Sequence, residues 1–93
     1  MDEKEEAVLS VAAIVLEAAA MADATLAGNF HEARFRAQLI VREAQAGGHV
    51  ELAAAAAQVA HLLGPLGSSP AIGYGAAMLQ MAEELDSIGI SSL

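Results

Sequence analysis

Few side chains in this 93-residue sequence could do chemistry, and they are widely spaced. The histidines His31, His49 and His61 fall on different segments, and none has a His or Glu at the spacing that places two metal ligands on one helix face. Glu17 stands alone in a long apolar stretch, and a single carboxylate does not make an acid–base site. No cysteine, phosphate loop or nucleophile motif is present. We therefore predict a protein that is not an enzyme, with no catalytic residue, no metal site and no cofactor.

His61 is the one residue for which the sequence suggests a reaction. It follows Ala60 near the end of a predicted helix, on the side away from that helix's apolar face, and Leu63 lies two residues after it. This stretch resembles the active-site hairpin of histidine phosphotransfer domains, in which an exposed histidine on a four-helix bundle accepts phosphate from a receiver domain. Gly64 and Pro65 stand where that pattern has lysine and glycine. The resemblance implies an alternative function, a signalling domain with His61 as phosphoacceptor.

The charge balance argues against two classes of partner. Twelve acidic and four basic residues give a net charge of −8, whereas nucleic-acid binding and attachment to anionic membranes need basic surfaces. The first residues, MDEKEEAV, are acidic where a secretory signal would be basic. The apolar segment 7–22 is shorter than the roughly 20 residues that span a bilayer, and it contains Glu17. We expect a cytoplasmic protein that binds neither nucleic acid nor membrane, with 7–22 as part of a buried helix.

The pattern of apolar residues and turn residues predicts an all-α domain. Glycines and a Gly/Ser/Pro-rich linker separate the apolar periodic segments, as expected between helices. The predicted fold is four antiparallel helices, as two helical hairpins or a small four-helix bundle, in one domain over residues 1–89 with a flexible tail over 90–93. The predicted helices cover about 2–27, 30–46, 49–63 and 70–88.

Capping residues set the predicted helix ends. Asn29 follows Gly28 and precedes Glu32 by three residues, which is a capping-box pattern at the start of the second helix. Ser69 and Pro70 have the residue types of an N-cap and a first helical position, so the fourth helix is expected to begin there. Gly89 is expected to end it.

The first helix is apolar on most of its circumference. Val8 and Val15 lie on one stripe and Leu9 and Leu16 on a second, whereas Glu17 belongs to a narrow polar strip. Ile14 and Met21 fall at the edge of that strip. A helix of this kind is expected to be buried on several sides, so we predict that it forms the centre of the domain.

The second helix carries two opposed apolar surfaces. Ala33, Ala37 and Ile40 form its predicted core face, and a second strip lies roughly opposite. Either the second helix is central and both strips are covered within the chain, or the second strip binds another molecule, which is our prediction. The first helix is longer than any helix available to cover it, so one copy is not expected to cover it fully. The predicted interface consists of Val8, Val15, Phe35, Leu39 and Ala46.

These patterns predict a small non-enzymatic module for protein–protein interaction or self-association, with an adaptor, regulatory or chaperone-like role. Alanine supplies much of the 56% hydrophobic content, and each alanine buries little area, so a second copy is the simplest source of further burial. We expect a homodimer. The sequence leaves open the identity of any other partner, the pathway, and a ligand cavity between the first and fourth helices.

Overall fold

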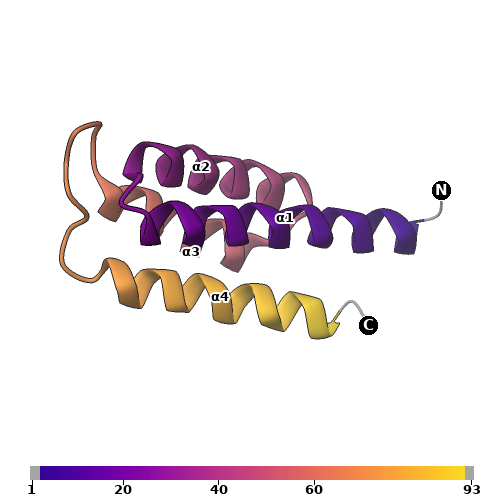
Figure 1. The fold of residues 1–93 in the computed structure, drawn as a ribbon. Coiled ribbons are helices and arrows are strands. Elements are labelled where there is room, and N and C mark those ends of the chain that lie inside the picture. Colours follow the sequence, from indigo (N-terminus) through magenta and orange to yellow (C-terminus); the bar gives the residue numbers. More distant parts are fainter. Residues whose placement is uncertain (1–2, 92–93) are drawn as a thin grey trace.

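The computed structural model describes residues 3–91, and among these the chain forms four helices and no strand. Figure 1 shows the chain reversing direction at each of the three connections, so that the helices lie side by side. The predicted all-α, four-helix fold is confirmed. The helices are α1 (Glu3–Leu26), α2 (Phe30–Ala46), α3 (Val50–Leu63) and α4 (Tyr74–Ser91).

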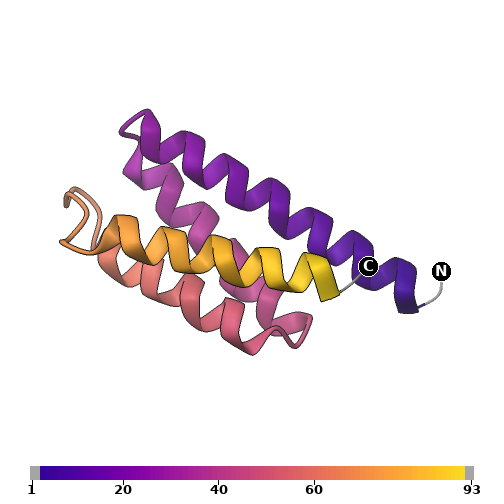
Figure 2. The same ribbon diagram turned by 90° about the horizontal axis from the view of Figure 1, so that it is seen from below.

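Each helix packs mainly on its neighbours in the sequence. α1 packs on α2, α2 on α3 and α3 on α4, whereas α1 and α4 touch only sparingly. A hydrogen bond between Thr25 Oγ1 and the Tyr74 hydroxyl, at 2.8 Å, connects α1 to α4. In Figure 2, α1 extends beyond the other helices at its amino end. The first helix is therefore an outer element of the bundle, and α2 and α3 are the helices with two neighbours each.

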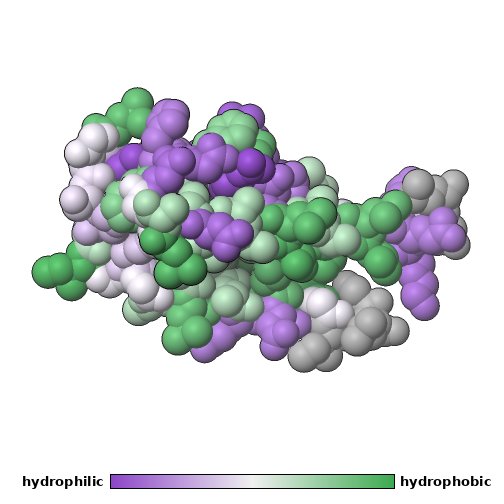
Figure 3. Space-filling model, viewed as in Figure 1, coloured by the Kyte–Doolittle hydropathy of each residue, from purple (hydrophilic) through white to green (hydrophobic). Residues whose placement is uncertain are grey.

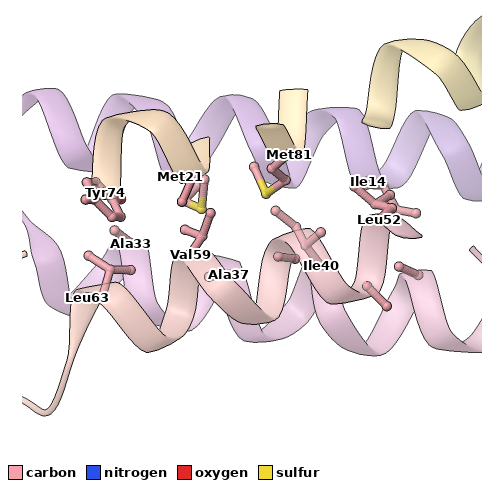
Figure 4. Packing of buried hydrophobic residues seen from close by; sticks show 14 of the residues in the cluster. Ile14, Met21, Ala33, Ala37, Ile40, Leu52, Val59, Leu63, Tyr74 and Met81 are labelled. Atoms are coloured by element: carbon pink, nitrogen blue, oxygen red, sulfur yellow. The ribbon is translucent and has the colours of Figure 1, made fainter. Parts of the chain in front are cut away.

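The core is small and rich in alanine. Six larger side chains are fully buried, and alanines from α2, α3 and α4 fill the space between them (Figure 4). The core face predicted for the second helix is confirmed at Ala33, Ala37 and Ile40, and α4 adds Tyr74 and Met81 to the core. The fully buried larger residues are Ile14, Met21, Ile40, Leu52, Val59 and Leu63.

The predicted burial of α1 is wrong. Its central inward residues are Ile14 and Met21, which have no exposed surface, whereas Val15 is 46% exposed and Leu16 71% exposed. The ion pair of Glu17 with a residue of α2 accords with this orientation, because it shows that the polar strip faces the neighbouring helix, with the edge of the strip in the core. The two apolar stripes that looked like core material are left on the outside.

The first turn follows the sequence prediction closely. Gly28 has a φ of +75°, a conformation that suits glycine, and Asn29 N–H donates to the Ala24 carbonyl at 2.8 Å. The Asn29 side chain accepts a hydrogen bond from the Glu32 backbone N–H at 3.2 Å. The predicted N-cap is confirmed, and α2 has the predicted bounds.

The predicted ends of the fourth helix are wrong. α4 begins at Tyr74, four residues after Pro70, because Gly73 has a φ of +96° and cannot lie inside an α-helix. The Ala71 N–H donates to the Leu62 carbonyl at 2.8 Å, so this segment is bonded to the last turn of α3 instead of joining α4. At the other end the helix continues through Gly89 to Ser91. Part of the predicted flexible tail is thus helical, and residues 92–93 lie outside the described residues.

Candidate interaction surface

The bundle leaves a broad apolar surface of α1 uncovered. We call it the α1 outer face. In Figure 3 hydrophobic residues follow α1 on the side of the molecule that is in view. The larger members are 46–71% exposed, and the alanines between them are exposed as well. The α1 outer face consists of Val8, Leu9, Ala12, Val15, Leu16 and Ala19.

The amino end of α1 extends past α2. α1 has 24 residues and α2 has 17, so about 10 Å of α1, at 1.5 Å per residue, lies beyond its neighbour in the sequence. Every residue from 3 to 9 is exposed. These first two turns therefore leave much of their surface in water.

The predicted strip on α2 is also at the surface. Phe35 is 54% exposed and Ala46 is exposed, whereas Leu39 is half-buried. We call these three residues the Phe35 strip. The Arg36 guanidinium lies 5.7 Å from the centre of the Phe35 ring, over its face. Because Arg36 contacts α1 and Leu39 follows one turn later, the Phe35 strip lies along the side of α2 that adjoins α1.

Arg36 is the main electrostatic contact between α1 and α2. Its Nη1 donates to Glu17 at 2.9 Å and its Nε donates to Glu32 at 2.8 Å. The hydrogen bond to Glu17, followed by that to Glu32, raises the pKa of Arg36 above its ordinary value. The sequence places three of the four basic residues on the second helix and predicts that this helix lies beside acidic surface, either within the chain or across a dimer. The ion pair of Arg36 with Glu17 provides such a contact within the chain.

Arg34 has a role that sequence reasoning missed. Its guanidinium donates to the carbonyls of Leu63, Gly64 and Ser68 at 2.7, 2.6 and 3.0 Å. Two of these carbonyls end α3, where unpaired backbone oxygens and the negative end of the helix dipole favour a cation. Arg34 therefore ties the carboxyl end of α3 and the following loop to α2.

We expect Arg34→Ala to lower the free energy of unfolding by about 2 kcal/mol. A hydrogen bond from a charged donor contributes about 1.5–3 kcal/mol, and the contributions of bonds that share one guanidinium are not additive. Urea unfolding followed by circular dichroism measures the change. Arg42→Ala is the matched control because Arg42 is an exposed arginine on the same helix. Equal stability of the two variants would contradict the assigned role of Arg34.

The histidines are not brought together. His61 is exposed in the last turn of α3, as predicted, while His31 lies at the start of α2 and His49 just before α3. Within the part of the chain that the structure describes, no three His, Asp or Glu side chains come close enough to hold a metal ion. The arrangement offers no converging set of titratable groups around any of the three.

α1 is long and apolar enough to cross a membrane, judged by length and composition alone. Core helices of soluble proteins and signal sequences meet the same criteria. Only 22% of its most apolar 18-residue window is buried, so the expectation of a buried helix over residues 7–22 is not met.

Comparisons with protein families, characterised proteins and solved structures find no match to this chain.

Proposed function

We propose that this domain is a small non-enzymatic module for protein–protein interaction that acts by self-association, as a homodimer. The observation that carries the proposal is the uncovered α1 outer face. The bundle buries one stripe of α1 and leaves a second, broader apolar surface in water. Burying apolar surface contributes about 25 cal/mol per Å², so covering this face stabilises the protein.

The area of the α1 outer face shows whether α1 alone can form the interface. A helix of this length is about 36 Å long and about 10 Å wide, so one face of α1 offers roughly 360 Å². A stable interface buries about 800 Å² on each partner. The α1 outer face is therefore too small alone, and the adjoining Phe35 strip supplies further apolar area. The interface of the proposal includes both surfaces and hence the five predicted residues, Val8, Val15, Phe35, Leu39 and Ala46.

Charge supports a protein partner over the alternatives. The net charge of −8 repels nucleic acid and anionic lipid. The first turn of α1 contains Glu3, Glu5 and Glu6, which adds to the acidic character of the surface. A cytoplasmic location and an adaptor, regulatory or chaperone-like role are part of the proposal.

Phe35→Asp tests the contribution of α2. We expect this variant to stay folded, because Phe35 is half-exposed, and to dimerise more weakly than the original chain. Sedimentation velocity over a dilution series measures the association. Ile72→Asp is the control, since Ile72 is fully exposed in the loop before α4. Unchanged association in Phe35→Asp would remove the Phe35 strip from the interface.

A second candidate function is supported by the surroundings of His61. The histidine is exposed, and Arg34 places a guanidinium on the carbonyls of Leu63 and Gly64 in the same helix end. That cation lies close in space to Gly64, the position where phosphotransfer domains have lysine. A phosphotransfer role requires acid-labile phosphate on the chain after incubation with a phosphorylated receiver domain, and its loss in His61→Ala. Labelling that persists in His61→Ala would exclude this role.

A further inference from the structure

The α1 outer face repeats every seven residues. Val8 and Val15, Leu9 and Leu16, and Ala12 and Ala19 are each separated by seven positions, which is two turns of helix. The two alanines lie along the middle of the face, opposite the buried stripe, with the valines on one side and the leucines on the other. A seven-residue repeat is typical of helices that pack along one another over several turns. The small side chains in the middle let a second helix approach closely.

The ends of α1 favour one direction for that second helix. Its first turn carries Glu3, Glu5 and Glu6, with Lys4 as the only base among them. Two copies in parallel would place these acidic turns side by side and align their helix dipoles, and both effects are unfavourable. Two antiparallel copies separate the acidic turns by the length of the helix.

We propose that the module's partner is a second copy whose α1 packs antiparallel on α1, with Ala12 opposite the partner's Ala19 and a two-fold axis between Val15 and Leu16. This inference rests on the proposed function, because it specifies how the self-association occurs. The two-fold axis makes both copies use the same surface, as in most homodimers.

In the antiparallel alignment, the exposed amino end of α1 also packs against the partner. Counted along the helices, residues 3–9 then lie beside residues 22–28 of the partner, so the first two turns cover the partner's Leu26, which is 87% exposed in one copy. Glu3 reaches the turn before the partner's α2, where the helix dipole is positive. The amino-terminal turns of α1 thus lie against apolar surface of the partner.

Cysteine cross-linking tests the alignment directly, because the chain contains no cysteine. Ala12→Cys and Ala19→Cys are made separately, one of them with an added tag, then mixed and oxidised. A disulfide needs Cα atoms about 4.4–6.8 Å apart, whereas two copies of the same position lie about 10 Å apart along the axis in the proposed alignment. We expect the tagged–untagged heterodisulfide in large excess over both homodisulfides. Ile72→Cys, at the fully exposed loop position, gives the level for random collision.

The outcomes separate the alignment from the function. Homodisulfides of both variants would show a parallel pair and overturn the alignment, while a dimeric mass would still support self-association. A dimeric mass, together with a disulfide yield no higher than that of Ile72→Cys, would place the interface elsewhere and would also overturn the alignment. A monomeric mass for the original chain would overturn the alignment and the homodimer together.

Discussion

Leu16→Glu is expected to leave the domain helical and to weaken self-association by about 100-fold or more. Leu16 is 71% exposed in one copy, so the glutamate remains in water there and keeps good helix propensity. In the proposed dimer, Leu16 would lie next to the two-fold axis, where two introduced carboxylates would be buried together without a cation. A factor of 100 corresponds to about 2.7 kcal/mol, which is modest for desolvating an unpaired charge.

The matched control for this variant is Leu79→Glu. Leu79 is 63% exposed, so the same substitution is made at a similarly exposed leucine on α4 instead of α1. Sedimentation velocity gives the association of each variant, and circular dichroism verifies that both remain helical. If Leu79→Glu weakened association as much as Leu16→Glu does, added negative charge alone would account for the loss, and α1 would have no special role.

The second large effect is expected in the core. Ile14→Ala should lower the free energy of unfolding by about 2–4 kcal/mol, because it removes buried methyl groups and leaves a cavity between α1 and the rest of the bundle. Val15→Ala, one residue later, should lower it by less than about 1 kcal/mol in the monomer, since Val15 is 46% exposed. Both substitutions are made in the Leu16→Glu background, so that dimerisation does not add to the measured stability.

Urea unfolding of this pair shows which stripe of α1 faces the core. The structure predicts that Ile14→Ala unfolds at a clearly lower urea concentration than Val15→Ala. A larger loss for Val15→Ala would mean that the stripe favoured by the sequence pattern is the buried one, and the α1 outer face would then not exist.

Local sequence patterns were sufficient to predict most of the fold. The apolar periodicity predicts the core faces of α2 and α3, and Gly28 with Asn29 predicts the first turn, because each depends on residues within a few positions. The exposure of Val8, Val15 and Phe35 agrees with their assignment to a surface, although their role in an interface stays a prediction.

The orientation of α1 could not be predicted in the same way. A helix that is apolar nearly all round gives no strong preference for one face, so its orientation depends on contacts with the other helices. Glu17, in the narrow polar strip, faces α2 and pairs there with Arg36, nineteen positions later in the chain. The sequence does place three of the four basic residues on the second helix, and that asymmetry was the available signal.

The start of α4 and the role of Arg34 also depend on distant contacts. Ser69 and Pro70 have the right residue types for a helix start, but the loop is bonded to the end of α3 through Ala71 and Arg34. Arg34 lies twenty-nine to thirty-four positions from the carbonyls that it binds. No local pattern identifies such a contact.

The mass of the unmodified chain in solution tests the central claim most directly. The monomer has a mass of 9.5 kDa. Sedimentation equilibrium at micromolar concentration should give about twice that value, and the average mass should fall toward the monomer on dilution. A concentration-independent mass of one chain would contradict self-association through the α1 outer face.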